Sequence, residues 1–195
     1  MSVQISSAPT GLSHLDELDL ALRSLRGEVG RVDRWARRLH DVLVGGGRVL
    51  ACGNGGSAAE AQHLTAELVG RYREDRPPFS ALCLCSESSS YTAIGNDYGP
   101  DAVFARQVSA HGRPGDVLVA ISTSGRSGNV LAAVEAARAA GMDTWALTGP
   151  APNPLAAACD DALSANSPHT ATVQEIHLVA LHLLCAAFDR ELACA

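Results

Sequence analysis

Lysine is absent from this chain, and all 15 of its basic residues are arginine. Schiff-base chemistry on a carbonyl substrate or on pyridoxal phosphate is therefore excluded, because it needs an amine nucleophile. The lysine that contacts the phosphates in a G-x-x-x-x-G-K-[ST] P-loop is missing as well. Any phosphate site in this protein must use backbone amides, hydroxyl groups or arginine.

Aromatic residues and excess positive charge are also scarce. Phe, Tyr and Trp make up 4% of the 195 residues, too few for a nucleic-acid surface built on base stacking. The 15 basic and 21 acidic residues give a net charge of −6, without a basic run. Binding to DNA, RNA or an anionic membrane surface is therefore disfavoured. An apolar content of 47% instead predicts one globular domain.

Cysteine motifs and targeting segments are lacking. No C-x-x-C occurs, so the sequence predicts buried free thiols in a reducing compartment rather than a zinc knuckle or a redox pair. The six cysteines are Cys52, Cys83, Cys85, Cys159, Cys185 and Cys194. The first 20 residues have neither the basic nor the apolar segment of a signal peptide, and no uninterrupted run of about 18 apolar residues is present. We therefore expect a cytoplasmic protein without a membrane span.

Residues 1–47 are expected to form an N-terminal helical arm that promotes self-association. From Leu15 to Leu43, apolar residues recur at alternating steps of three and four, which is the period of a narrow helix-packing seam. Gly27 and Gly30 lie off this seam, where they are placed to divide the arm into two helices. A narrow seam favours pairing with another helix. The alternative is that the arm folds onto its own domain.

Residues 48–195 are expected to form a single α/β domain. Five apolar segments predict strands, and helical patterns alternate with them up to a buried last helix over about residues 170–192. The predicted strands cover residues 48–52, 80–85, 116–122, 142–149 and 160–165. Near-continuous apolar strands that alternate with helices are typical of a parallel sheet covered on both faces.

Two loops that follow predicted strands favour a phosphorylated small molecule as ligand. The first is Gly53-Asn54-Gly55-Gly56-Ser57, and the second is Ser122-Thr123-Ser124-Gly125-Arg126-Ser127. In parallel sheets, ligands bind beyond the carboxyl ends of the strands, close to helix N-termini. Glycines permit close approach of the backbone, and the hydroxyls and amides form an anion cradle. The first loop does not meet the dinucleotide pattern G-x-G-x-x-G, because position 58 is Ala58.

Titratable side chains on two helices are candidates for catalysis or metal binding. His63 and Glu67 are four residues apart on the helix after the first loop, so they share a face. Gln174 and His182 lie about 80° apart around the last helix. These nitrogen and oxygen donors suit zinc or a similar divalent ion, and equally a base and an acid that work without a metal. His177 points about 140° away from His182 and is assigned to the core or to an interface. No polar constellation is expected around His14, His40, His111 and His169.

Five motifs occur in order over about residues 48–192. They are Gly53-Asn54-Gly55-Gly56-Ser57, His63-x3-Glu67-Leu68-x-Gly70-Arg71-Tyr72-Arg73, Gly95-Asn96-Asp97, Ser122-Thr123-Ser124-Gly125-x-Ser127 and Gln174-Glu175-Ile176-His177-x4-His182. Together they resemble the sedoheptulose 7-phosphate isomerases (phosphoheptose isomerases) of the sugar isomerase (SIS) superfamily. The resemblance implies a three-layer α-β-α sandwich with a five-stranded parallel sheet, and a homotetramer with active sites between subunits. It also implies conversion of sedoheptulose 7-phosphate to D-glycero-D-manno-heptose 7-phosphate.

The resemblance further implies roles for single residues. Glu67 would be the base that moves a proton between C1 and C2 through an enediol, and His182 would be the acid that serves the substrate oxygens. Phosphate would be held by Ser57, Ser122, Ser124 and Ser127, with Thr123 lining the same loop. Sugar contacts would come from Asn54, Gly55, Gly56, Asn96, Asp97 and Gln174. In zinc-binding members, the ligands of one ion per subunit would be His63, Glu67, Gln174 and His182.

Two departures from the family pattern bear on substrate and function. Ala171 and Thr172 stand where the family commonly has Asp-Arg, so one substrate hydroxyl contact is expected to be missing. Ala58-Ala59-Glu60 replaces a common His-Cys-Asp and is closer to the replication-initiator-associating branch, whose members bind a protein. The alternative function is thus a non-catalytic SIS module that binds a phosphosugar or a partner protein. Because Glu67 and His182 are both present, we favour the enzyme.

Overall fold

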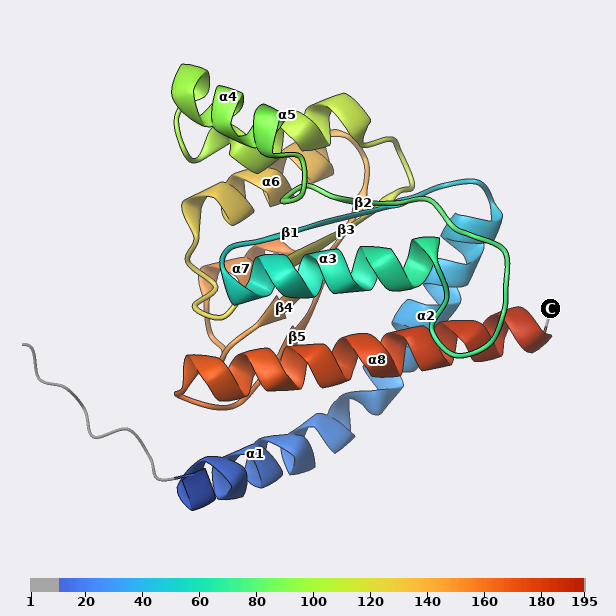
Figure 1. Ribbon diagram of the computed structural model, residues 1–195, viewed down its shortest axis with the longest axis vertical. Coiled ribbons are helices and arrows are strands. Elements are labelled where there is room, and N and C mark those ends of the chain that lie inside the picture. Colours follow the sequence, from blue (N-terminus) through green and yellow to red (C-terminus); the bar gives the residue numbers. More distant parts are fainter. Residues whose placement is uncertain (1–10, 195) are drawn as a thin grey trace, which may run out of the picture.

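Five parallel strands in the order β2-β1-β3-β4-β5 form the central sheet (Figure 1). The structure, a computed structural model, describes residues 11–194. Its strands are β1 (Val49–Gly53), β2 (Ala81–Cys83), β3 (Val117–Ser122), β4 (Asp143–Thr148) and β5 (Asp161–Ser164). All five predicted strands and their parallel arrangement are confirmed. Strand β2 is shorter than expected because its pairing with β1 stops at Cys83, where the chain turns away toward the next helix.

Helices cover both faces of the sheet, which confirms the three-layer sandwich. One layer contains α2 (Val29–Val44), α3 (Gly56–Val69) and α8 (Thr170–Cys194), with α1 (Gly11–Leu25) packed against α8. The opposite layer contains α5 (Ala102–His111), α6 (Gly128–Ala139) and α7 (Pro154–Ala158), with α4 (Ser88–Tyr98) packed outside α5. Strands β1 and β3 are buried along their whole length, because residues alternate between the two covered faces.

The N-terminal arm divides at Gly27, as the sequence predicts. Helix α1 ends at Leu25, and a 3₁₀ turn (Arg26–Glu28) leads directly into α2. The seam residues of α2, such as Leu39 and Leu43, are buried in the same core as the sheet. Leu15 of α1, by contrast, is 60% exposed. Helix α2 therefore packs on its own chain, and a role of the arm in oligomerisation stays a prediction.

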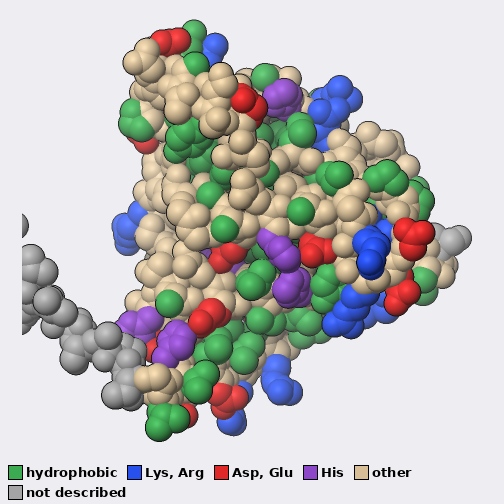
Figure 2. Space-filling view, in the orientation of Figure 1, with side chains coloured by type: hydrophobic (Ala, Val, Ile, Leu, Met, Phe, Trp, Pro, Cys, Tyr) green, Lys and Arg blue, Asp and Glu red, His purple; other side chains and the backbone are tan. Residues whose placement is uncertain are grey.

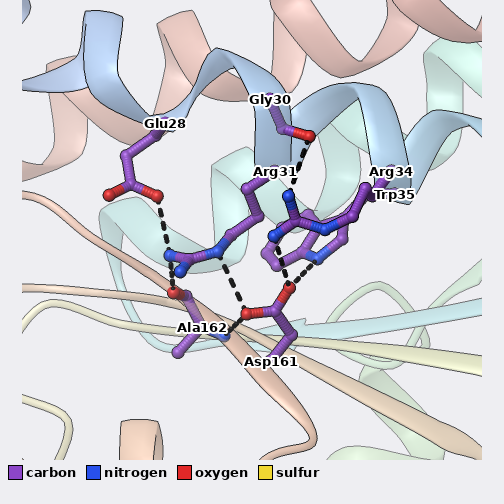
Figure 3. Close-up of polar contacts among 7 residues, drawn as sticks. All are labelled: Glu28, Gly30, Arg31, Arg34, Trp35, Asp161 and Ala162. Atoms are coloured by element: carbon purple, nitrogen blue, oxygen red, sulfur yellow. Dashed lines mark hydrogen bonds and ion pairs between the residues drawn. The ribbon is translucent and has the colours of Figure 1, made fainter.

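Asp161, at the start of β5, anchors α2 to the sheet (Figure 3). Its carboxylate accepts a hydrogen bond from Trp35 Nε1 at 2.9 Å and pairs with Arg31 Nε at 3.0 Å. Arg31 also pairs with Glu28 at 2.7 Å and donates to the carbonyl of Ala162. Beside this network, the Trp35 ring stacks on Trp145 of β4 with 4.8 Å between centroids. These contacts tie residues more than a hundred positions apart into one unit.

Helix α8 confirms the predicted buried last helix. It is the one described helix long and apolar enough to cross a membrane, with a mean hydropathy of 1.5 over its most apolar window. Of that window, 56% is buried against the rest of the chain. Its buried residues, such as Ile176 and Phe188, pack against α2, α3 and the sheet. Its apolar character is therefore accounted for by its place in the core.

Candidate active site at the carboxyl edge of the sheet

The loop after β1 has a backbone that only glycine accommodates. Gly55 lies in the left-handed region with φ +57°, which L side chains rarely adopt. A Cβ on Gly53 would lie 2.6 Å from the Ser57 carbonyl oxygen, so the chain turns there without room for a side chain. This tight turn starts α3 directly at the carboxyl end of β1 and buries Ser57 in its first turn.

The loop after β3 concentrates hydroxyl groups at the N-terminus of α6. Ser122 Oγ and Ser127 Oγ are 3.1 Å apart and share a hydrogen bond, and the Arg126 amide donates to Ser124 Oγ at 3.2 Å. Gly125, with φ +61°, makes the turn between them. The Ser127 hydroxyl hydrogen-bonds to Ser122 and makes no side-chain cap to α6. Amides and hydroxyls at a helix N-terminus are the groups that bind phosphate.

A reciprocal pair of hydrogen bonds joins the two loops. Asn54 and Asn129 each donate their side-chain amide to the other at 2.9 Å. One pocket of about 200 Å³ opens between the first loop and α4, lined in part by Asn54, Gly55 and Tyr91. A second pocket of about 240 Å³ lies beside Thr123 and Ser124, opposite Ser167 and Thr170. The two loops thus border adjoining hollows at one edge of the sheet.

His63, Glu67 and His182 gather between α3 and α8. Their ligand atoms all lie within 4.8 Å of one another, with His63 Nε2 at 2.8 Å from His182 Nε2 and at 3.4 Å from Glu67 Oε1. All three side chains are half-buried, and Figure 2 shows histidines at the surface between the two helices. The Tyr72 ring stacks on His182 with 5.6 Å between centroids. The predicted juxtaposition of the two helices therefore exists.

The donor set of this cluster fits a divalent metal ion. Two imidazole nitrogens and a carboxylate oxygen are ordinary zinc ligands, and tetrahedral ligands at about 2.0–2.1 Å from zinc lie roughly 3.4 Å apart. The separations of 2.8 and 3.4 Å, and of at most 4.8 Å across the cluster, allow the three atoms to approach one ion. In addition, Glu67 Oε2 is buried without a hydrogen-bond partner among the described residues. A buried carboxylate oxygen without a partner indicates a missing ligand or substrate.

Comparison with known proteins identifies the family of the chain. The family model described as SIS domain matches residues 15–149. The chain is 64% identical over 184 residues to the phosphoheptose isomerase of Streptomyces coelicolor, which covers 94% of this chain and 80% of that protein. The chain belongs to the phosphoheptose isomerase family. It resembles the structure of phosphoheptose isomerase GmhA from Neisseria gonorrhoeae with a TM-score of 0.85 at 42% identity, over 92% of this chain and 96% of that one. The structure of a phosphoheptose isomerase from Francisella tularensis gives 0.82 at 35%, over 93% and 100%.

Gln174, the fourth metal ligand that the family motif implies, lies further along the same groove. A Cβ on Gly56 would lie 2.3 Å from Gln174 Nε2, so the carboxamide packs directly on the first turn of α3. Only a glycine at position 56 leaves room for it. Gln174 therefore contacts the first loop of this phosphoheptose isomerase family member, and its role as a metal ligand stays a prediction.

Asn96 and Asp97, the remaining predicted sugar contacts, lie on α4. Both side chains are exposed, and Asn96 Nδ2 donates to Asp97 Oδ1 at 2.9 Å. Within residues 11–194, neither side chain hydrogen-bonds to the two loops. The structure thus clusters His63, Glu67 and His182 and packs Gln174 on Gly56, and the roles of the predicted site residues stay predictions.

Arg76 is a residue of the site that sequence reasoning missed. Its guanidinium donates to the carbonyls of Glu67 at 2.6 Å and Leu68 at 3.0 Å, and its Nε pairs with Asp189 of α8 at 2.9 Å. Arg76 therefore caps the end of α3 and ties it to α8. Two histidines were also misjudged: His14 lies 2.9 Å from Glu175, and His169 lies 3.3 Å from Glu17. Both contacts link α1 to the start of α8, which spacing along one helix does not reveal.

All six cysteines are free thiols, as predicted. Cys85 lines the pocket beside the first loop, with its Sγ 3.2 Å from the Gly53 carbonyl oxygen. A hydrogen bond from Cys85 lowers the pKa of the neighbouring Cys83 thiol to about 6. The same bond, together with burial, raises the pKa of Cys85. Burial also raises the pKa of Cys185, close to Glu67, to about 12. The two neighbouring thiols of Cys83 and Cys85 are thus shifted in opposite directions.

Proposed function

We propose that this chain isomerises sedoheptulose 7-phosphate to D-glycero-D-manno-heptose 7-phosphate. The observation that carries the proposal is the convergence of His63, Glu67 and His182 beside two anion-binding loops, in a member of the phosphoheptose isomerase family. Ketose–aldose isomerisation requires a base, an acid and an anchored phosphate. This site holds side chains suited to each of these tasks.

The two loops hold the phosphate end of the substrate. Ser57 lies at the N-terminus of α3, and Ser122, Ser124 and Ser127 surround that of α6, with Thr123 lining the same loop. Because lysine is absent, amides, hydroxyls and the helix N-termini supply the attraction for the phosphate charge. Contacts to the sugar come from Asn54, Gly55, Gly56, Asn96, Asp97 and Gln174.

Glu67 and His182 carry the proton transfers. Glu67 removes a proton from C1 of the ketose while His182 protonates the oxygen on C2, which gives an enediol. Glu67 then returns the proton to C2 while His182 takes the proton from the hydroxyl on C1, which gives the aldose and restores both groups. Glu67 has one oxygen 3.4 Å from His63 Nε2 and a second, buried oxygen without a hydrogen-bond partner among the described residues, so its carboxylate is not committed to another protein donor.

When zinc is bound, His63, Glu67 and His182 would hold one ion per subunit, with Gln174 as the fourth ligand. The cluster geometry and its mixed nitrogen and oxygen donors support this assignment. A divalent ion at this place supplies positive charge that stabilises developing negative charge on the substrate oxygens. Tyr72 and His63 contact the His182 ring from two sides and orient it.

The chain assembles into a homotetramer in the cytoplasm, and residues 1–47 form its oligomerisation arm beside a domain over residues 48–195. Leu12, Leu15 and Leu20 of α1 are 77%, 60% and 67% exposed, an apolar surface that a neighbouring subunit would cover. The six free cysteines suit a reducing compartment. The alternative of a non-catalytic SIS module is not favoured, because the acid–base pair is present and assembled.

Turnover of the named substrate tests the proposal. Purified protein is incubated with sedoheptulose 7-phosphate, with and without added zinc, and the aldose product is followed by NMR. Aldose formation supports the isomerase, and a dependence on zinc supports the metal site. Absence of product in both conditions, with the assembly intact, would contradict the proposal and favour another phosphosugar, given Ala171, or the binding module.

A further inference from the structure

Three contacts join α3 and α8 in register along their length. The two helices lie side by side and run in the same direction (Figure 1). In order along the two helices, Gly56 contacts Gln174, Glu60 faces His177, and His63 contacts His182. The first and third contacts belong to the site described above. The second, between Glu60 and His177, has no place in the reaction.

The pair of Glu60 and His177 is buried and self-contained. His177 is completely buried and Glu60 is 7% exposed. The Thr148 carbonyl at the end of β4 lies 3.1 Å from His177 Nε2 and can only accept, so this nitrogen carries a proton. His177 Nδ1 lies 3.5 Å from Glu60 Oε2, and neither atom has a hydrogen-bond partner within residues 11–194. Within residues 11–194, the 3.5 Å contact between Nδ1 and Oε2 is the polar contact found for these two buried atoms, and buried polar atoms without a partner are costly.

The pair lies close in sequence to the two histidines of the metal cluster, one on each helix. Glu60 is three residues before His63 on α3, and His177 is five residues before His182 on α8. A slip of α8 by one helical turn would move it about 5.4 Å along α3 and would separate His182 from His63. Apolar packing alone tolerates such slips better than a directional buried contact does, and single buried polar groups are known to fix helix register.

We infer that Glu60 and His177 form a positioning pair that fixes the register of α8 on α3 and thereby holds His182 at metal-binding distance from His63 and Glu67. His177 is tied at once to α3 through Glu60 and to β4 through Thr148, so it locks three elements together. The inference rests on the proposed function for its effect on catalysis. Its structural part, the separation of His63 and His182, does not depend on that function.

Two substitutions of His177 separate its contacts. In His177→Asn the amide nitrogen takes the place of Nδ1, so the contact with Glu60 is kept and that with Thr148 is lost. In His177→Gln the amide nitrogen takes the place of Nε2, so the reverse holds. Zinc affinity is measured by competition with a chromophoric chelator, the visible spectrum of the cobalt-loaded protein reports ligand geometry, and kcat and KM are measured on sedoheptulose 7-phosphate. Val108→Ala, in the core of α5 on the opposite face of the sheet, serves as a destabilised control remote from α3 and α8.

We expect His177→Gln to lower zinc affinity relative to the wild type, with an altered cobalt spectrum and a lower kcat at unchanged KM, because His182 would no longer be held beside His63. His177→Asn and Val108→Ala are expected to stay close to the wild type. Equal affinities in the two His177 variants, or the reverse order, would overturn the inference. If the wild type neither binds zinc nor isomerises the sugar, the proposed function fails. Crystal structures of the two His177 variants then test the positioning pair. Only His177→Gln should lengthen the 2.8 Å distance between His63 Nε2 and His182 Nε2.

Discussion

The Nε2 atoms of His63 and His182 lie 2.8 Å apart, although 119 residues separate these histidines in the chain. The sequence of each helix alone does not show that its histidine meets the other. Their proximity arises because α3 and α8 lie side by side on the same face of the sheet, with Glu67 one turn beyond His63. The chemistry of the site is therefore a property of how two helices dock.

Removal of one imidazole tests whether this cluster holds a metal. His63→Ala leaves two of the three clustered ligand atoms, and we expect zinc affinity to fall by more than the roughly 10- to 100-fold that loss of an outer-shell partner costs. His111→Ala, at the exposed end of α5, removes a histidine far from the cluster and should leave zinc affinity unchanged. Chelator competition measures both. Equal affinities for the two variants would place the metal elsewhere.

Hydroxyl groups of the loop after β3 are expected to govern substrate affinity. Ser127→Ala removes one donor to the phosphate, and a hydrogen bond to a charged group contributes about 1.5–3 kcal/mol. KM for sedoheptulose 7-phosphate should therefore rise roughly ten- to hundredfold, with kcat changed less. Ser109→Ala, which removes an exposed hydroxyl from α5, is the control. An unchanged KM in Ser127→Ala would show that the phosphate binds outside this loop.

Two aspartates at strand starts should differ in their contribution to stability. Asp161→Ala leaves the indole N–H of the buried Trp35 without its acceptor, which costs about 1–3 kcal/mol in the free energy of unfolding. Asp143→Ala removes an ion pair with Arg38 whose side chains are 36% and 45% exposed, worth about 0–1 kcal/mol. Urea unfolding at neutral pH compares the two variants. Equal losses would contradict the anchoring role of Asp161.

The thiol of Cys83 should titrate well below the ordinary range. A hydrogen bond from Cys85 lowers its pKa from 9.0 to about 6, so the folded protein holds Cys83 as thiolate between these values while the unfolded chain binds a proton. The bond therefore stabilises the fold fully above pH 9, and the contribution is lost as pH falls through 6. Alkylation of Cys83 by iodoacetamide, followed by mass spectrometry, should show a midpoint near 6. In Cys85→Ala this midpoint should move up toward 9.0, and a midpoint near 9 in both proteins would refute the account.

The sequence predicted the sheet well because its strands are continuous apolar runs, whose burial on both faces leaves little choice of structure. The pairing of His63 with Glu67 followed from helical spacing alone, and the location of the loops followed from their place after strands. Contacts between helices that are distant in the sequence could not be predicted from it. No periodicity shows that Arg76 caps α3 and binds Asp189, or that His177 meets Glu60. The apolar seam of α2 likewise predicts that another helix packs on it, but it does not show that this helix is α8 of the same chain.

Glu67 is the residue on which the isomerase account depends most. Glu67→Gln keeps the shape of the side chain and removes its capacity to accept a proton, so turnover of sedoheptulose 7-phosphate should fall by at least about 10²- to 10⁴-fold. The most direct measurement compares this variant with the wild type by NMR, with saturating zinc and with the oligomeric mass of both confirmed. The account predicts aldose from the wild type and almost none from the variant. Substantial aldose from Glu67→Gln would contradict it, because another group would then be the base.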